Sequence, residues 1–212
     1  MYPSKHWLSQ LMLITSPSKH HLSTKIQSSE RRLHFYGKGE EIPLLEQGIW
    51  SISSGFVQLV GVNNQGDETW LGWASQGHFF GLWLTSLDSF KARALSDVYL
   101  QWYNLQEIEK SPQIAQTVLA QTVVRVKQTE QLLAIAGLKR VEEKLIELLR
   151  LLSNCIGENL NDDYTRLTVR FTHQNLASAI GTTRVTVTRL LGDLQKDGLI
   201  SFDKSRHIIV KK

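Results

Sequence analysis

The chain has 212 residues, 42% of them hydrophobic, and carries 24 Lys and Arg against 20 Asp and Glu. This length suits one large domain or two small ones with hydrophobic cores. No apolar run approaches the ~20 residues of a membrane span, and the single cysteine excludes an internal disulfide framework and a four-cysteine iron–sulfur cluster from this chain.

The N-terminal residues show no signal for export, because the apolar stretch 11–14 is too short for the core of a signal peptide. We therefore expect a cytoplasmic protein without a membrane partner. The adjacent His20 and His21 would point apart on a strand, so they make a poor metal pair.

Residues 37–102 are predicted to be rich in β-structure. Glycines punctuate this region, and short β-prone segments lie between them at 49–52, 56–60, 69–73 and 98–102. The segment 63–67, Asn-Asn-Gln-Gly-Asp, is a turn signal. Short strands joined by such turns are typical of a β-sandwich or β-roll. We expect the tryptophans here to pack in the core, with an exposed partner-binding face as the alternative: Trp50, Trp70, Trp73 and Trp83.

A long helix is predicted from Pro112 to Gly137, since proline suits the first turn of a helix. Its apolar residues recur near heptad spacing: Ile114, Val118, Leu119, Val123, Val126, Leu132, Leu133 and Ile135. Packing against a second copy of the chain would bury this surface. The alternative is a helix packed on its own N-terminal domain.

A second helix is predicted from Arg140 to Leu152, with an apolar stripe that would pack the core of the C-terminal region. Cys155 follows this helix in an apolar stretch. We expect it to be a small buried hydrophobic residue, with a redox sensor as the alternative.

Residues 171–194 predict two short helices around a tight turn. Thr172 is a good N-cap, and Gly181 can end the first helix in a left-handed conformation. Thr182 or Thr183 can cap the second helix, whose apolar stripe is Val187, Leu190, Leu191 and Leu194. The residues off that stripe include Arg184, Val185, Thr188 and Arg189, which should face outward and could enter a DNA major groove.

The segment 198–210 is typical of a strand, a turn and a second strand. Residues 168–212 hold eight Lys and Arg against three acids, a net charge of +5, so the rest of the chain is −1. Such segregation of positive charge favours phosphate binding. The alternative is a pair of amphipathic helices with a solvated basic face.

These motifs resemble the Crp/Fnr family of transcription regulators, and residues 181–194 closely resemble the recognition helix of its cyanobacterial nitrogen-control branch. The resemblance is strong over 165–212, fair over 110–150 and weak over the first hundred residues. It implies an α+β fold with a β-roll sensor domain over 1–110, a dimerisation helix over 111–137 and a winged helix-turn-helix over 138–212. It also implies a homodimer on a palindromic promoter site with GTA-type half-sites.

We predict DNA contacts from both helices and from the turn between the last two strands. The predicted contact residues are Thr172, His173, Gln174, Thr183, Arg184, Val185, Thr186, Thr188, Arg189, Lys204 and Arg206. Arg189 is expected to contact guanine, and Val185 or Thr188 a thymine methyl group. Val185 stands where regulators of the cyclic-AMP type use glutamate, so the half-site should differ from theirs.

The resemblance gives a divided prediction for the effector. Leu82 stands where the family's cyclic-nucleotide pocket has glutamate, and Asp88 begins the stretch that should supply the phosphate-binding arginine. We therefore do not expect cyclic AMP to bind. Arg125 and Glu130 match the helix motif of the 2-oxoglutarate pocket in the nitrogen-control branch, but Asp88 would repel a dicarboxylate. An ion pair is the alternative role for Arg125 and Glu130.

No P-loop, no Gly-x-Gly-x-x-Gly and no paired-histidine metal motif occurs, so we predict no enzymatic activity and no metal or cofactor. The expected partners are double-stranded DNA, a second copy of the chain and RNA polymerase. Two alternatives remain open. One is a co-regulator that acts through protein contacts of its sensor domain, and the other is a 2-oxoglutarate-responsive nitrogen regulator.

Overall fold

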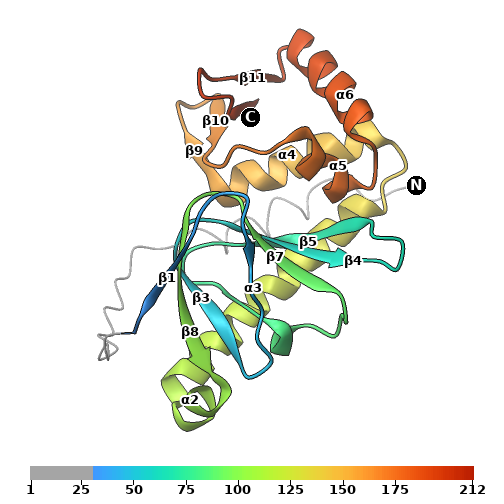
Figure 1. Cartoon of the computed structure of the whole chain (residues 1–212). Helices are drawn as coiled ribbons and strands as arrows, with labels where there is room; N and C mark the ends of the chain where they lie inside the picture. Colours follow the sequence, from blue (N-terminus) through green and yellow to red (C-terminus); the bar gives the residue numbers. More distant parts are fainter. Residues whose placement is uncertain (1–30) are drawn as a thin grey trace, which may run out of the picture. The chain divides into compact units, whose positions relative to one another are not determined.

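The computed structural model describes residues 31–212, so residues 1–30 of the first predicted domain, His20 and His21 among them, lie outside the described residues. The first part of the described chain is a sandwich of two antiparallel sheets (Figure 1). One sheet has the order β1 (Leu33–Tyr36), β8 (Val98–Asn104), β3 (Gly48–Ser54), β6 (Phe79–Phe80). The other has the order β2 (Glu41–Ile42), β7 (Phe90–Ala94), β4 (Val57–Val62), β5 (Glu68–Ala74).

Alternating side chains form the core of the sandwich. In β7, Phe90, Ala92 and Ala94 are buried while the intervening Lys91 and Arg93 are partly exposed. This period of two is the pattern of a strand with one face toward a core. One apolar cluster joins buried residues of β7 and β4 to those of β3 and β8, so the two sheets enclose a shared core.

Details of the sandwich agree with its sequence signals, with one exception. Asn63 closes the predicted turn, because its side-chain Oδ1 accepts hydrogen bonds from the backbone N–H groups of Gln65 and Asp67. Trp50, Trp70 and Trp73 are buried as expected. The prediction was wrong for Trp83, which is 54% exposed in the short 3-10 helix η2 (Leu82–Leu84).

The short helix α2 (Leu105–Lys110) leads into the long helix α3 (Pro112–Ala136), with Ser111 as N-cap and Pro112 in the first turn. One face of α3 packs on the sandwich through the buried residues Val118, Gln128 and Ile135. Ile114 and Leu132 are partly buried, whereas Leu119, Val123, Val126 and Leu133 are exposed. The packed face therefore follows the alternative of a helix resting on its own domain, and it uses only part of the apolar surface.

A buried amide fixes α3 against strand β5. Gln128 Oε1 accepts a hydrogen bond from the Trp73 backbone N–H at 3.1 Å and one from Arg125 Nη1 at 3.3 Å. The strand pairing shifts register here, and Gly72 has φ +134°. A Cβ at residue 72 would collide with Gln128 Oε1, so the bulge and its glycine make room for the amide.

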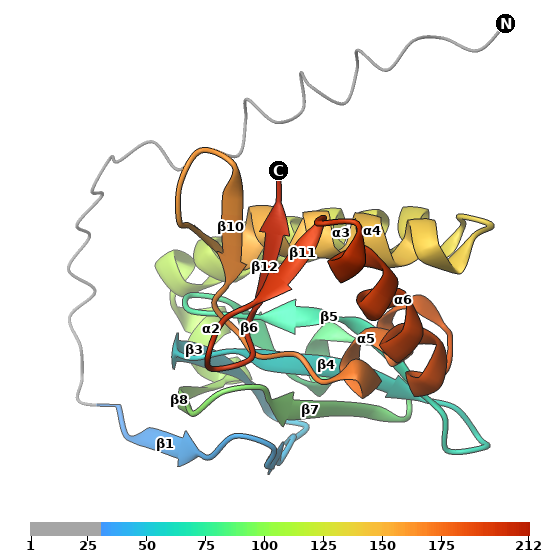
Figure 2. The same cartoon turned by 90° about the horizontal axis from the view of Figure 1, so that it is seen from above.

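The C-terminal part packs three helices on a small sheet (Figure 2). The helices are α4 (Val141–Ile156), α5 (His173–Ile180) and α6 (Arg184–Lys196). The sheet has the order β11 (Ile200–Phe202), β12 (Ile208–Lys211), β10 (Tyr164–Leu167), β9 (Gly157–Asn159). Leu145, Leu148 and Leu152 of α4 are fully buried in this core, as predicted. Cys155, expected to be buried, is exposed, and it lies in the last turn of α4, which ends at Ile156.

The C-terminal part contacts the sandwich directly. The rings of Phe171 and Trp70 lie 5.7 Å apart, and Asn175 Nδ2 donates to Gln58 Oε1 at 3.1 Å. Trp70 and Trp73 belong to the same apolar cluster as the core of the C-terminal helices. None of the described helices is long and apolar enough to cross a membrane.

Candidate nucleic-acid interface and effector cavity

Local sequence sets the geometry of the helix pair α5–α6. The Thr172 side chain accepts from the Asn175 backbone N–H, and the Asn175 side chain accepts from the Thr172 N–H, which closes a capping box. Gly181 ends α5 at φ 66° and ψ 49°, the left-handed conformation that glycine adopts at little cost. Thr183 then caps α6 through a hydrogen bond from the Thr186 N–H. These caps are the ones that the sequence predicts.

Helix α6 has a buried face and an exposed face of different chemistry. The predicted stripe of Val187, Leu190, Leu191 and Leu194 is buried. The opposite face exposes Arg184, Val185, Thr188 and Arg189. Val185 is 79% exposed, more than any other large hydrophobic residue in the described part of the chain. Arg189 Nη1 lies 3.1 Å from Asp193 Oδ2, an i,i+4 ion pair that aligns the guanidinium along the helix surface.

His173 links the first helix of the pair to the second. Its Nδ1 lies 2.7 Å from Thr188 Oγ1, and the Thr188 hydroxyl donates to the Arg184 backbone carbonyl at 2.9 Å. Burial is the main cause that lowers the pKa of His173 below its usual value, and the positive charges of Arg184 and Arg206 lower the pKa further. At neutral pH the imidazole is therefore uncharged in the free protein.

The hairpin β11–β12 presents two basic side chains at its tip, Lys204 and Arg206, both exposed. Its turn is closed by a hydrogen bond from the Arg206 N–H to the Asp203 carbonyl at 3.0 Å. Arg206 has φ 65°, the only positive value at a non-glycine residue in the described chain. Glycine usually occupies such a position after a hairpin turn, so arginine is held there at a conformational cost.

We expect Arg206→Asn to separate stability from binding. Asparagine tolerates the left-handed region better than arginine does, so the free energy of unfolding should rise by about 0.5–1 kcal/mol. DNA affinity should fall, because one cation leaves the hairpin tip. Urea unfolding and a DNA titration on the same preparation measure both quantities. A destabilised variant would show that the arginine side chain supports the fold.

The sequence of this chain is similar to a known domain family and to known regulatory proteins. Residues 139–212 match the family model described as a Crp-like helix-turn-helix domain. The regulatory protein CysR of Synechococcus elongatus is 30% identical over 179 residues, covering 82% of this chain and 82% of that protein. The chain belongs to the Crp/Fnr family of transcription regulators. The global nitrogen regulator of the same organism is 29% identical over 194 residues, covering 87% of this chain and 85% of that protein.

Solved Crp/Fnr structures share the fold. A Crp/Fnr-family regulator from Thermus thermophilus superposes with a TM-score of 0.67 at 22% identity, covering 84% of this chain and 93% of that one. FixK2 from Bradyrhizobium japonicum gives a TM-score of 0.69 at 20% identity, covering 86% and 93%. The predicted α+β class, with a β-sandwich, a long helix and a helix-turn-helix with its wing, is confirmed. As a member of this family, the chain is a DNA-binding transcription regulator and not an enzyme.

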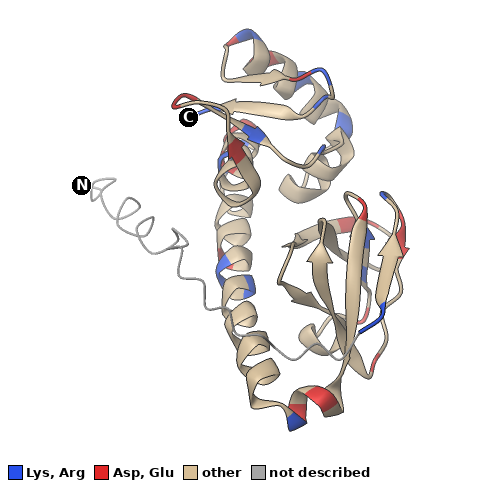
Figure 3. Ribbon diagram, turned by 90° about the vertical axis from the view of Figure 1, so that its left-hand side faces the viewer, with Lys and Arg blue, Asp and Glu red and all other residues tan. Residues whose placement is uncertain are grey.

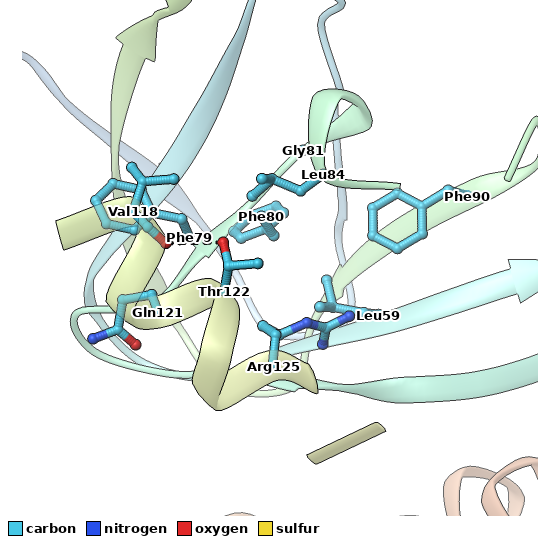
Figure 4. Close-up of a pocket in the computed structure, with 10 residues that line it drawn as sticks. All are labelled: Leu59, Phe79, Phe80, Gly81, Leu84, Phe90, Val118, Gln121, Thr122 and Arg125. Carbon is cyan, nitrogen blue, oxygen red and sulfur yellow. Dashed lines mark hydrogen bonds between the residues drawn. The ribbon is translucent and has the colours of Figure 1, made fainter. Parts of the chain in front are cut away.

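A small cavity lies between α3 and the sandwich, with a volume of about 50 Å³ (Figure 4). Its lining is mainly apolar, with Phe80, Phe90 and Leu59 on the sandwich side. Arg125 and Thr122 point into it from α3 (Figure 4). Burial lowers the pKa of Arg125 to about 10, so the guanidinium keeps its charge at neutral pH. No carboxylate of the described residues pairs with it.

The structure separates the other predicted effector residues from Arg125. Glu130 is exposed on α3, whereas Arg125 is turned toward the sandwich, so the two do not form an ion pair within one chain. Asp88 is exposed and does not line the cavity, so its charge opposes an anion there less than the sequence suggests. Arg93 does not face solvent freely, since it forms a two-point ion pair with Glu68 at 2.8 and 3.1 Å.

Sequence reasoning missed two polar groups on the same side of α3 as Arg125. One is Gln128, whose Oε1 accepts a hydrogen bond from the Arg125 guanidinium. The other is Gln121, whose buried Oε1 has no hydrogen-bond partner among the described residues. Gln121 lies four positions before Arg125, and Gln128 lies three positions after it. This is the spacing of residues on one helix face, so helical periodicity could have indicated both. Among the described residues no group of His, Cys, Asp and Glu is arranged to hold a metal ion.

Proposed function

We propose that this regulator binds a palindromic promoter site as a homodimer, with one α6 helix in the major groove of each half-site. The exposed face of α6 is the observation that carries the proposal. It places two arginines and a strongly exposed valine on one side of a helix whose other side is buried. Exposed arginine can bind guanine at two points, and an exposed valine suits a thymine methyl group.

The contacts divide into base recognition and backbone positioning. We assign Arg189 to guanine, Arg184 to guanine or phosphate, and Val185 and Thr188 to a thymine methyl group. The residues at the two helix starts and the wing would hold phosphates. This second group comprises Thr172, His173, Gln174, Thr183, Thr186, Lys204 and Arg206. Figure 3 shows basic positions on the helix-turn-helix and its wing.

The exposed side of α3 supports the homodimer. Leu119, Val123, Val126 and Leu133 are 66, 48, 52 and 72% exposed and follow one another at intervals of four, three and seven residues. This is the a/d spacing of a two-stranded coiled coil, and it leaves Glu130 at the remaining seam position. An exposed apolar stripe of this kind is typical of a helix that packs against a partner helix. A second copy supplies one by two-fold symmetry.

Selection of binding sites from random DNA tests the proposal. The expected result is enrichment of a two-fold palindrome with GTA-type half-sites about one helical turn apart, because a dimer presents its two α6 helices at that spacing. Footprinting should then show protection in two adjacent major grooves. A pool that remains random after repeated rounds, despite retained folding, would contradict sequence-specific binding.

Lys204 should separate the wing from the base contacts. Lys204→Ala is expected to weaken binding equally on the selected site and on random DNA, and to reduce the slope of log affinity against log salt by about one unit per subunit. Fluorescence anisotropy over a series of salt concentrations measures this slope. An unchanged slope would remove the wing tip from the interface.

For the effector, we propose a small anionic ligand at Arg125. A largely buried guanidinium without a carboxylate is costly unless an anion occupies its site, and Arg125 is such a group at the wall of the cavity. The cavity of about 50 Å³ holds a few waters. A ligand as large as 2-oxoglutarate exceeds this volume, so it would have to displace lining residues such as Leu84 of η2. We do not expect cyclic AMP to bind, since Leu82 stands where the family's cyclic-nucleotide pocket has glutamate.

Titration calorimetry with 2-oxoglutarate, cyclic AMP and cyclic GMP tests this assignment. We expect no binding of either nucleotide, and DNA binding without them. If 2-oxoglutarate binds, Arg125→Ala should abolish that binding, whereas Arg93→Ala, which removes an arginine outside the cavity, should not. Micromolar binding of either nucleotide would contradict the proposal that the protein binds no cyclic nucleotide.

A second function, as a co-regulator acting through its sensor domain, is favoured by one observation. The segment from η2 to β7 exposes Trp83, Leu84 and Leu87, at 54, 37 and 44%. A contiguous apolar segment is suited to protein contact, and RNA polymerase is the partner that we propose for a promoter-bound regulator. Replacing Trp83 by Ser should lower transcription in vitro without changing DNA affinity.

A further inference from the structure

Two hydrogen bonds in series determine which nitrogen of His173 carries its proton. The Thr188 hydroxyl has one hydrogen, and it donates this hydrogen to the Arg184 carbonyl at 2.9 Å. With the hydrogen so placed, the Thr188 oxygen accepts at 2.7 Å from His173 Nδ1, and we assign the proton of the neutral imidazole to Nδ1 on this basis. In the neutral imidazole the other nitrogen, Nε2, is therefore an acceptor with a lone pair.

The surroundings of His173 suit an anion. Arg184 on α6 and Arg206 on the wing are the charged groups that act on the imidazole in the described structure, and both are positive and exposed. Nε2 has no hydrogen-bond partner among the described residues. A neutral Nε2 repels a phosphate oxygen, because both atoms present lone pairs. A protonated Nε2 donates to the same oxygen in a charge-assisted hydrogen bond.

We infer that Thr188 is a positioning residue that makes His173 a proton-gated phosphate contact: DNA binding protonates the imidazole at Nε2, and one proton is taken up per subunit. This inference rests on the proposed binding of DNA through α5, α6 and the wing. It adds a regulatory property, since the affinity for DNA then depends on pH.

The direction of the effect follows from the two states of His173. In the free protein its pKa lies below the usual value, and a bound phosphate raises it. Between these two pKa values binding takes up the proton, so affinity rises as pH falls. Each unit by which phosphate raises the pKa gives about a tenfold gain per subunit at the acidic end of this window. Outside the window the profile is flat.

The experiment compares pH profiles of DNA affinity on the selected palindrome and on a random duplex, from about pH 8 to about pH 6. Four variants accompany the wild type. His173→Gln places an amide N–H donor near Nε2 at every pH. Thr188→Val keeps the methyl group of threonine and replaces the hydroxyl acceptor by a second methyl group, so a neutral imidazole can take the Nε2–H form. Thr188→Ser keeps the hydroxyl. His207→Gln removes the other titratable imidazole of the C-terminal domain, which pairs with Asp203 at 3.1 Å.

We expect the wild type, Thr188→Ser and His207→Gln to gain about tenfold or more in affinity as pH falls, on both duplexes. His173→Gln should have a flat profile, because it has no imidazole to titrate, and Thr188→Val should have a shallower profile than the wild type. Calorimetry of DNA binding in buffers of different ionisation enthalpy should show proton uptake that His173→Gln loses and Thr188→Val reduces.

Two outcomes overturn the inference. One is a Thr188→Val variant that binds more weakly at all pH values with the wild-type slope, since that result makes Thr188 merely structural. The other is a wild type that binds DNA without proton uptake, which leaves the proposed DNA binding intact. A wild type that binds neither duplex at any pH contradicts the proposed function itself.

Discussion

Replacing Val123 and Val126 together by glutamate should convert the protein to a monomer and lower its affinity for the palindrome by about 10²–10⁴-fold. Both residues lie on the exposed apolar side of α3 and are half exposed in the single chain. Four carboxylates would meet across a two-fold seam, and like charges there oppose association. Analytical ultracentrifugation and anisotropy with a whole palindrome and a half-site measure both effects.

The matched control places the same charges on another side of α3. Thr117 and Gln131 are exposed and lie outside the apolar stripe, so the double substitution Thr117→Glu and Gln131→Glu should leave the dimer and its affinity unchanged. The monomeric variant should keep a folded C-terminal domain and bind a half-site as weakly as it binds the palindrome. A dimer of full affinity in the first variant would place the interface elsewhere.

Replacing Arg189 by alanine should lower affinity for the selected site by about 1–3 kcal/mol and relax the sequence preference at one position in each half-site. The effect comes from loss of a two-point contact with guanine. It should therefore be much larger on the selected palindrome than on random DNA. Repeating the selection with the variant identifies the position that loses its preference.

Lys196 provides the control for charge alone. It lies on the same helix and also approaches Asp193, at 3.8 Å, but at the end far from the N-terminal turns that we propose enter a groove. Lys196→Ala should lower affinity slightly and to the same extent on both kinds of DNA. Equal losses from Arg189→Ala on specific and random DNA would show that Arg189 contacts phosphate rather than a base.

The elements of the fold could be predicted wherever a local rule decides the structure. Gly181 in its left-handed conformation, the caps at Thr172 and Thr183 and the buried stripe of α6 all depend on residues within one or two turns of chain. The hairpin that forms the wing follows from the alternation of buried and exposed residues along its two strands. Because the exposed face of α6 is the complement of its buried stripe, the candidate DNA contacts follow from the same local pattern.

The remaining features depend on contacts between distant segments. The pairing of His173 with Thr188 requires the angle between two helices, and the pairing of Gln128 with Trp73 joins residues 55 apart in sequence. Neither leaves a periodic signal. Cys155 was expected to be buried because its neighbours in sequence are apolar, but it is exposed in the last turn of α4, where the helix ends. Trp83 was misjudged because a large aromatic side chain usually indicates a core.

The amide of Gln128 has a consequence for the geometry of the proposed dimer. By fitting into the bulge at Gly72 it opposes a turn of α3 about its own axis relative to the sandwich. Together with the buried Val118 and Ile135, it therefore helps to set the direction in which the apolar stripe on the other side of the helix points. In the proposed two-fold dimer that direction would determine how far apart the two α6 helices stand. Half-site spacing on the promoter would then depend on an amide that is not among the proposed DNA contacts.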